Sequence, residues 1–189
     1  MARVSQAQAQ QNRDRVIDEA ARLFRERGVH QVSVADLMAA AGLTHGGFYK
    51  RFASKEALVA EATGRAFGDL QDRLAVLDER HPGDHAGARR ELLDYYFSAE
   101  HRDQAGQGCP TTALGGDMAR EAPDSPARVP YADGVRDFAR WMADGDDEDL
   151  MAIATMAGAL MLSRATAGTD LSDRILAAAR RSLEDRARS

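Results

Sequence analysis

The sequence contains few of the features that stabilise secreted proteins or hold a chain in a membrane. Its only cysteine is Cys109, which excludes an intrachain disulfide framework and is typical of a reducing compartment. The Gln- and Ala-rich beginning has no apolar segment like that of a secretory signal. The longest apolar run, residues 150–162, is too short to cross a bilayer. We therefore expect a soluble, cytoplasmic protein that does not enter the membrane.

Motifs for catalysis, cofactors and metal ions are also missing. The chain has no HExxH pair, no Gly-rich phosphate loop and no Cys/His cluster with ligand spacing. His81 and His85 have i, i+4 spacing, but Pro82 and Gly83 interrupt any helix between them. The acidic run at 144–149 lacks the pattern of a calcium loop and would supply negative charge to the start of the next helix. We expect no enzyme activity, no catalytic residues, no cofactor and no metal.

Strand signals are absent, whereas helical spacing of apolar residues recurs along the chain. Residues 1–12 are polar and are expected to form a flexible tail. Ser33, Thr44 and Ser54 are suitable N-caps for the second, third and fourth helices. The first four helices are expected to end at Gly28, at Gly42, near Phe52 and beyond Leu77, and the others to lie near 86–102, 110–121, 131–143, 149–166 and 171–186. The pattern therefore predicts an all-α fold of about nine helices.

Charge is divided unevenly along the chain. The net charge is −5, but residues 1–55 carry nine Lys/Arg and five Asp/Glu, a balance of +4, which leaves −9 for residues 56–189. This asymmetry indicates that the first part of the chain meets a polyanion. Chance fluctuation is the alternative that charge alone leaves open.

The stretch "GLTHGGFYKRF" at 42–52 suggests what that polyanion is. Two short helices joined by Gly42-Leu43-Thr44 match a helix-turn-helix, whose second helix enters the major groove of DNA. Two glycines in that helix each cost about 1 kcal/mol relative to alanine, but the missing side chains would let the backbone approach DNA closely. Phe48 and Phe52 would anchor the opposite face in the core.

Several side chains around this motif could contact DNA. His45 is the leading candidate for a base contact, the alternative being an exposed histidine that only helps to start the helix. Lys50 and Tyr49 would reach the flanking phosphates, and Lys55 opposes its own helix dipole, which favours a phosphate contact. The full set of expected DNA-binding residues is Ser33, Thr44, His45, Gly46, Gly47, Tyr49, Lys50 and Lys55.

Residues 15–62 resemble the DNA-binding domain of the tetracycline-repressor (TetR) family of bacterial regulators. The matching residues are Ala20, Leu23, Phe24, Gly28, Ala41-Gly42-Leu43, the Phe-Tyr-x-x-Phe of 48–52, and Ser54-Lys55-Glu56-Ala57-Leu58. The resemblance implies an all-helical homodimer with a three-helix DNA-binding domain, here 13–55, and a larger effector-binding and dimerisation domain, here 56–189. Many members carry a side chain where Gly46 or Gly47 stands, so base contacts would depend mainly on His45, Lys50 and shape.

The second part of the chain offers candidates for a small-molecule pocket with an apolar lining and a few polar groups. These candidates are Phe67, Tyr95, Tyr96, Cys109, Thr112, Met118, Phe138, Trp141 and Met142. Ordinary core packing is the alternative for each of them. Cys109 lies before Pro110 at a helix start, where it could be a thiol sensor or simply a buried small residue.

The last two helices are candidates for a dimer interface. Residues 150–162 are apolar around most of a helix, more than a single core face requires. Two such helix pairs would form a four-helix bundle across a two-fold axis. The expected interface residues are Leu150, Ile153, Ala154, Ala157, Leu160, Met161, Ile175, Ala179 and Leu183.

Together these features predict a DNA-binding transcriptional regulator. It would act as a homodimeric repressor on a double-stranded, pseudo-palindromic operator and be released by a small-molecule effector. The alternative is a helical small-molecule sensor or enzyme that uses residues 86–145 for chemistry.

Overall fold

The computed structural model describes residues 6–143 and 147–186, and all regular structure in these two ranges is helical. The elements are α1 (Gln6–Arg27), α2 (Val34–Ala40), the 3-10 turn η1 (His45–Gly47), α3 (Lys55–Arg80), α4 (His85–Tyr96), α5 (Ala99–Asp103), the 3-10 turn η2 (Ala105–Gln107), α6 (Pro110–Arg120), α7 (Arg128–Ala143), α8 (Leu150–Ala165) and α9 (Asp170–Arg186). The predicted all-α class is confirmed. No helix of the described ranges is long and apolar enough to cross a membrane.

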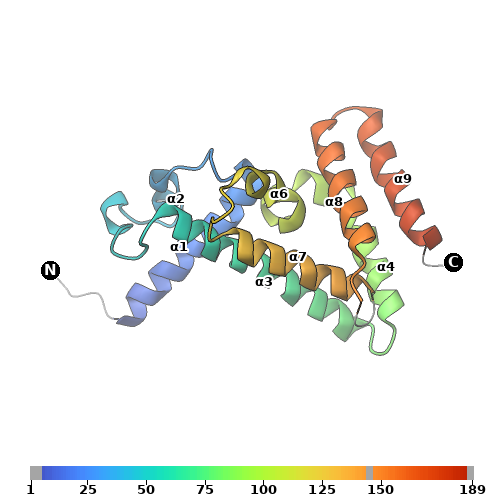
Figure 1. Ribbon diagram of the computed structural model, residues 1–189, viewed down its shortest axis with the longest axis horizontal. Coiled ribbons are helices and arrows are strands. Elements are labelled where there is room, and N and C mark those ends of the chain that lie inside the picture. Colours follow the sequence, from blue (N-terminus) through green and yellow to red (C-terminus); the bar gives the residue numbers. More distant parts are fainter. Residues whose placement is uncertain (1–5, 144–146, 187–189) are drawn as a thin grey trace.

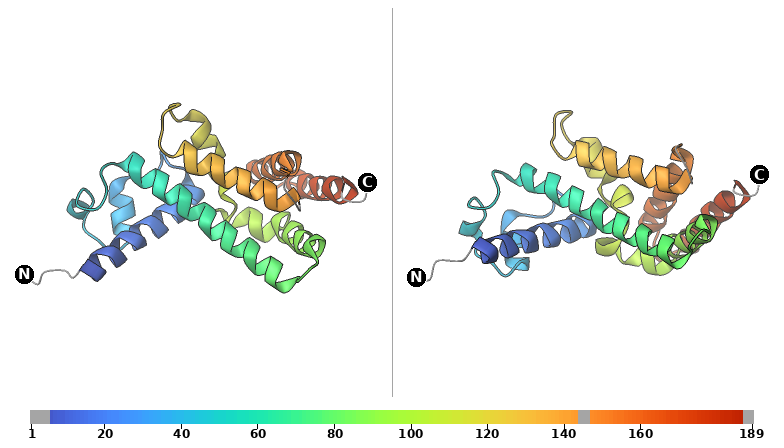
Figure 2. Two further views of the ribbon diagram at one scale, coloured as in Figure 1. Left: turned by 60° about the horizontal axis from the view of Figure 1, so that its bottom comes forward. Right: turned by 90° about the horizontal axis from the view of Figure 1, so that it is seen from below.

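The molecule is elongated, with different helices at its two ends. Helices α1 and α2 and the turn η1 lie at one end, and α8 and α9 lie at the other (Figure 1). The long helix α3 runs diagonally between them, with α7 alongside it (Figure 2). Because α3 has 26 residues, at about 1.5 Å rise each it is roughly 39 Å long.

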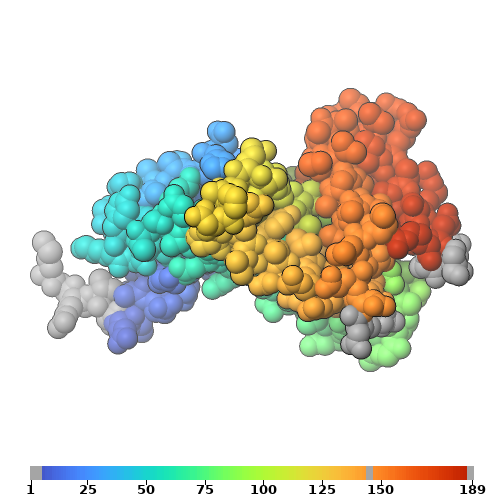
Figure 3. Space-filling view, in the orientation of Figure 1, coloured from blue at the N-terminus to red at the C-terminus, as the bar shows by residue number. Residues whose placement is uncertain are grey.

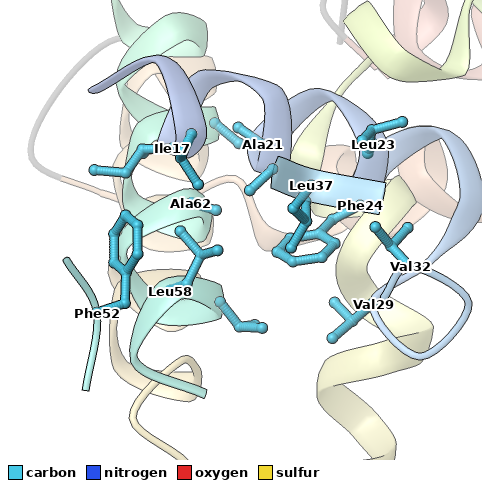
Figure 4. Close-up of a cluster of buried hydrophobic side chains, with 14 of the residues drawn as sticks. Ile17, Ala21, Leu23, Phe24, Val29, Val32, Leu37, Phe52, Leu58 and Ala62 are labelled. Carbon is cyan, nitrogen blue, oxygen red and sulfur yellow. The ribbon is translucent and has the colours of Figure 1, made fainter. Parts of the chain in front are cut away.

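Two hydrophobic clusters make up the core, and α3 contributes to both. Leu58 and Ala62, near the start of α3, pack with Phe24 of α1 and Leu37 of α2 in the first cluster (Figure 4). Further along the same helix, Leu74 belongs to the second cluster, together with residues of α4, α7, α8 and α9. Helix α3 therefore connects the core under η1 with the core of the larger helical part.

Serine caps confirm two of the predicted helix starts. The Ser33 hydroxyl oxygen accepts a hydrogen bond from the Asp36 backbone N–H at 3.1 Å, within a complete capping box. The Ser54 hydroxyl oxygen accepts from the Ala57 N–H at 3.1 Å. Such caps satisfy N–H groups that have no partner in the first turn of a helix.

The predicted third helix, from Thr44 to about Phe52, is wrong in its extent. Only residues 45–47 form a 3-10 turn, and irregular turns follow it as far as Arg51. Among the described residues the Thr44 side chain makes no capping hydrogen bond. Two glycines without a cap lower the stability of an α-helix by about 2 kcal/mol, which explains why a full helix does not form here.

Three further boundaries differ from the prediction. The expected helix at 86–102 is divided, because Ser98 accepts a hydrogen bond from the His101 N–H at 3.1 Å and starts α5. Helix α7 begins at Arg128, with Pro130 in its first turn, where proline is tolerated. Residues 6–12 belong to α1 rather than to a tail, with a Gln10–Asp14 side-chain hydrogen bond of 3.0 Å along the helix. Residues 1–5 lie outside the described ranges.

The acidic run is described only in part, because residues 144–146 lie outside the described ranges. Its last residue, Asp149, caps α8, since its Oδ1 accepts a hydrogen bond from the Ala152 N–H at 2.9 Å. Negative charge at the start of this helix agrees with the expected role.

Candidate functional site

The residues expected to contact DNA surround η1, and we call residues 44–51 the tip. Thr44, His45 and Gly46 are exposed, and so are the two residues after Phe48. Gly47 is partly buried. The tip therefore presents a short backbone segment with few side chains, followed by one aromatic and one basic side chain.

Adjacent aromatic residues in the tip point in opposite directions. Phe48 is fully buried, and its ring lies 5.4 Å from that of Phe52. Tyr49 has 70% of its surface exposed and touches Phe48 only edge-on, with ring centroids 5.1 Å apart. Burial of the two phenylalanines fixes the tip on the first core, as the sequence predicts, and leaves the Tyr49 hydroxyl in solvent.

The two glycines of the tip have different surroundings. A Cβ atom added to Gly46 would meet no described atom within 4 Å, so this position faces open space. A Cβ atom at Gly47 would lie 2.6 Å from Nη1 of Arg51, which donates a hydrogen bond of 2.6 Å to the Gly47 carbonyl. Close approach to an outside partner is thus available at Gly46, whereas Gly47 leaves room for Arg51. Sequence analysis did not assign this role to Arg51.

Two of the expected phosphate contacts already have intramolecular partners. The Ser33 hydroxyl donates to Asp36 Oδ2 at 2.6 Å, within its capping box. The Lys55 ammonium donates to the Val29 carbonyl at 2.9 Å and so connects the start of α3 with the end of α1. Lys50, Tyr49 and Ser33 are exposed, whereas Lys55 is partly buried.

A cavity of about 450 Å³ lies in the larger helical part. Its walls come from α3 and α4, and it is closed by α5, η2 and the residue before α6. Among the expected pocket residues, Tyr95, Tyr96 and Cys109 line this cavity. Arg73 and His101, which the sequence pattern did not indicate, also line it. The i, i+3 and i+4 spacing of leucines along α3 could not distinguish a cavity wall from a core face.

The remaining expected pocket residues lie elsewhere. Phe67, Phe138 and Met142 pack in the second core, and Met118 packs in the first. Trp141 donates from its indole N–H to Asp78 Oδ2 at 2.8 Å. Thr112 lines a shallower groove of about 380 Å³ between α6, α7 and α8, and its Oγ1 lies 2.9 Å from the Tyr96 hydroxyl. Packing against neighbouring helices, which local spacing does not reveal, decides these positions.

His101 holds the segment that closes the cavity. Its Nδ1 lies 2.8 Å from the Tyr96 carbonyl, and its Nε2 lies 3.1 Å from the Cys109 backbone N. The carbonyl requires a proton on Nδ1 and the amide requires a free lone pair on Nε2, so the imidazole is neutral. Burial agrees, because it lowers the pKa of His101 to about 4. Burial likewise raises the pKa of Tyr96 well above its ordinary value.

The expected dimer residues divide between the chain's own core and its surface. Ile153, Leu160 and Leu183 are buried within the second core. Leu150 and Met161 are exposed, each with 56% of its surface accessible. The other expected residues, Ala154, Ala157, Ile175 and Ala179, are exposed or partly buried. Figure 3 shows α8 at the surface of one face, far from α1 and α2.

The described residues contain no group of three or more His, Cys, Asp or Glu side chains placed to hold a metal ion. His81 and His85 have different partners. His81 Nε2 lies 2.7 Å from Glu91 Oε2, and His85 Nε2 lies 2.7 Å from the Trp141 carbonyl. These histidines connect helices.

Comparison with known proteins identifies the N-terminal part of the chain. Residues 16–62 match the bacterial regulatory proteins of the tetR family. The chain is 32% identical over 93 residues to the HTH-type transcriptional regulator AcrR of Shigella flexneri, covering 49% of this chain and 43% of that protein. It is 34% identical over 99 residues to TtgR of Pseudomonas putida, covering 52% and 47%. The matched region is about half the length of these relatives.

Solved structures extend the likeness to the remaining helices. A TetR transcriptional regulator from Chloroflexus aurantiacus superposes with a TM-score of 0.67 and 29% identity, over 94% of both chains. A regulator of the same family from Agrobacterium tumefaciens has a TM-score of 0.72 over 94% of this chain and 98% of that one. At 18% identity the second likeness concerns the fold alone. Residues 16–62 therefore carry a match to the DNA-binding domain of the tetR family, and the fold of the chain is similar to that of solved regulators of this family.

Proposed function

We propose that this protein is a DNA-binding transcriptional repressor that acts in the cytoplasm as a homodimer. It would bind a pseudo-palindromic operator and leave it when a small-molecule effector occupies the helical part. The tip supports this proposal most directly, because a side-chain-poor segment is held outward by buried Phe48 and followed by exposed Tyr49 and Lys50. Such a surface can approach base edges and the phosphate backbone at once.

Within the tip, each exposed group would have its own part. His45 would reach a base edge and Gly46 would allow the backbone to approach closely, because nothing described lies within 4 Å of its Cβ position. Lys50 and Tyr49 would bind the flanking phosphates. Ser33 and Lys55 would add phosphate contacts only by sharing or exchanging their present partners, Asp36 Oδ2 and the Val29 carbonyl. Their contribution would then be smaller than that of Lys50.

The dimer would form through the exposed face of α8 together with α9. Leu150, Met151, Met161 and Leu162 each expose more than half of their surface on α8. Burial of this apolar face against a second copy would remove it from water, at about 25 cal/mol per Å². The exposed face would rest on side chains that are already buried in the chain's own core, those of Ile153, Leu160 and Leu183.

An effector would act through the segment from His101 to Asp117, which closes the cavity and also contacts α1. Arg25 Nε of α1 donates to the Gly106 carbonyl at 2.9 Å. The Val29 backbone N–H, just beyond α1, donates to Asp117 Oδ2 of α6 at 3.0 Å. A ligand that displaced this segment would therefore displace α1 and change the separation of the two tips in the dimer.

The proposal is tested first by a gel-shift experiment with duplex fragments from around the protein's own coding region. A discrete complex at low salt that random DNA does not compete away is expected. The chain also offers a chemical footprint, because its only two lysines are Lys50 and Lys55. Bound DNA should slow acetylation of Lys50 by acetic anhydride, as measured by mass spectrometry. No shift with any genomic fragment, or unchanged Lys50 labelling in a complex, would end the proposal.

The dimer is tested separately by sedimentation. Met161→Glu places a charge on the exposed α8 face and should shift the protein from dimer to monomer without loss of helical circular dichroism. Arg174→Glu, on the polar side of α9, is the matched control. A Met161→Glu variant that stays dimeric would place the interface elsewhere.

A further inference from the structure

Three guanidinium groups from distant parts of the sequence surround the Cys109 end of the cavity, which we call the inner end. Arg25 comes from α1, Arg73 from α3 and Arg164 from α8. Arg73 and Cys109 line the cavity itself. All three guanidinium groups donate hydrogen bonds to carbonyls of the segment before Cys109: Arg25 to Gly106, Arg73 to Gln107, and Arg164 to residues 101 and 102. The inner end therefore concentrates positive charge.

Few negative charges at hydrogen-bonding distance balance these guanidiniums. Arg25 reaches Asp69 Oδ2 at 3.5 Å, a weak contact to a carboxylate that is 45% exposed. Arg164 donates only to carbonyls within the described chain, those of His101 and Arg102 at 3.0 and 2.9 Å. Arg73 makes one hydrogen bond among the described residues, from Nη1 to the Gln107 carbonyl at 2.8 Å. Carbonyl dipoles satisfy donors, but they do not neutralise the charge.

Arg25 does not line the cavity, but it contacts the same segment and has a buried donor without a partner among the described residues. Only 8% of its surface is exposed, and its Nη1 is buried with no hydrogen-bond partner among the described residues. Burial without full compensation lowers the pKa of this guanidinium. A buried donor without a partner is costly, and native proteins usually supply one from the chain, from water or from a ligand.

At the opposite end of the cavity, a carboxylate pairs with the basic side chains. Arg80 Nη1 lies 2.8 Å from Glu91 Oε1, and His81 Nε2 lies 2.7 Å from Glu91 Oε2. Between the two ends the walls are mainly aliphatic and aromatic, with Leu70, Leu74 and Leu92 among them. His101, being neutral, adds no positive charge at the inner end.

We infer that the cavity binds an amphipathic anion, with an apolar body along the leucine wall and a carboxylate head at Arg73 on the inner end. This inference rests on the proposed effector site and names the chemical class of its ligand. A carboxylate matches the fork of guanidinium N–H donors, and Arg73 is exposed, so its fork is accessible to an incoming head. The apolar body would gain from burial in a cavity of about 450 Å³.

The competing source of negative charge is the chain itself. The carboxylate of Asp72, which also lines the cavity, or that of Asp69, which reaches Arg25, could serve as the counter-ion. An internal carboxylate and a bound one would then compete for the same guanidiniums. The experiment below separates these two cases.

Binding is measured by calorimetry on the full chain without DNA, using 4-phenylbutyrate and 2-naphthoate, each against its primary amide. The acids should bind at least ten times more tightly than the amides. Arg73→Met should reduce this preference to less than threefold, whereas Arg80→Met, on the same helix and lining the same cavity, should keep it. Thermal unfolding of each variant without ligand shows that the fold is intact.

Equal affinity for acid and amide, or no binding of any of the four probes at millimolar concentration, would overturn the inference. A preference that survives Arg73→Met would also overturn it, because the head would then bind elsewhere. If the preference appears only in Asp72→Asn, the chain's own carboxylate is the counter-ion and the site for a bound carboxylate is refuted. The calorimetry contains no DNA, so its result does not depend on the gel shift. Failure of the gel shift would refute the proposed function but not the binding of the carboxylate.

Discussion

The tip and the inner end of the cavity both present positive charge, but in opposite environments. Lys50 at the tip is exposed and Tyr49 beside it has 70% of its surface in solvent. At the inner end Arg73 is exposed, but Arg25 is only 8% exposed, and one of its nitrogens lacks a partner among the described residues. An exposed cation stays hydrated and acts through a field that salt screens. A buried cation has lost part of its hydration and therefore gains more from a fitting anion.

This difference indicates two kinds of recognition in one chain. The tip suits an extended polyanion, whose many phosphates need positive charge but little burial. The inner end suits a single small anion that replaces lost water. The following predictions test whether the two regions differ in this way, beginning with the largest effect.

The tip depends on a buried anchor and an exposed contact that are adjacent in sequence. Phe48→Ala should lower the free energy of unfolding by about 3–5 kcal/mol, since the ring is fully buried. Tyr49→Ala should change it by less than about 0.5 kcal/mol, yet weaken DNA binding. Urea denaturation and gel shifts of both variants check this. A similar stability loss in both would mean that the tip is an ordinary part of the core.

We expect the His45 side chain to distinguish the operator from random DNA. His45→Ala is expected to weaken binding to the operator by about 1–3 kcal/mol while leaving binding to random DNA nearly unchanged. Competition gel shifts with both duplexes measure the ratio. Equal losses on the two DNAs would reduce His45 to an electrostatic contact.

Burial of His101 at the inner end should make the free energy of unfolding depend on pH. The pKa of His101 falls from 6.5 in the unfolded chain to about 4 in the fold, so between these values the unfolded state binds more protons. Stability from this group is complete above about pH 6.5 and is lost as the pH falls towards 4, by about 2 kcal/mol between pH 7 and pH 5.

Urea denaturation of the wild type and of His101→Gln at both pH values isolates this contribution. The glutamine keeps an acceptor for the Cys109 N–H, and the variant should show a flatter pH dependence. The same slope in both proteins would mean that other groups cause it.

Lys50 should produce the smallest effect, because it is exposed. Lys50→Ala should weaken operator and random DNA alike, by less than about 1 kcal/mol, and reduce the slope of log K against log salt by about one. Carboxylate binding in the cavity should depend less on salt, because it neutralises one small anion rather than many phosphates. Lys55→Ala is the informative companion, since it also removes the hydrogen bond to the Val29 carbonyl and should lower stability. Equal salt dependence in tip and cavity would remove the distinction between them.

Much of the fold could be predicted from local patterns. The caps at Ser33 and Ser54, the buried pair Phe48 and Phe52, and the exposed Tyr49 are where the sequence indicates. Each of these features depends on residues within one helical turn. The third helix was predicted too long, because the helical spacing of Phe48 and Phe52 outweighed two glycines and a threonine that makes no cap among the described residues.

The cavity could be predicted only in part. Tyr95, Tyr96 and Cys109 line it as expected, but Phe138 and Met142 are core residues. An apolar side chain at helical spacing packs in a core or lines a cavity according to the helix it meets, and spacing does not identify that helix.

By itself, the sequence determined the helical class, most helix starts, and the residues of the tip that are buried or exposed, because these depend on propensity, capping and spacing within a few residues. Only the tertiary structure decided that Arg25, Arg73 and Arg164 meet on the segment before Cys109. Their helices are far apart in the chain, so only the packing of α1, α3 and α8 brings their charges together.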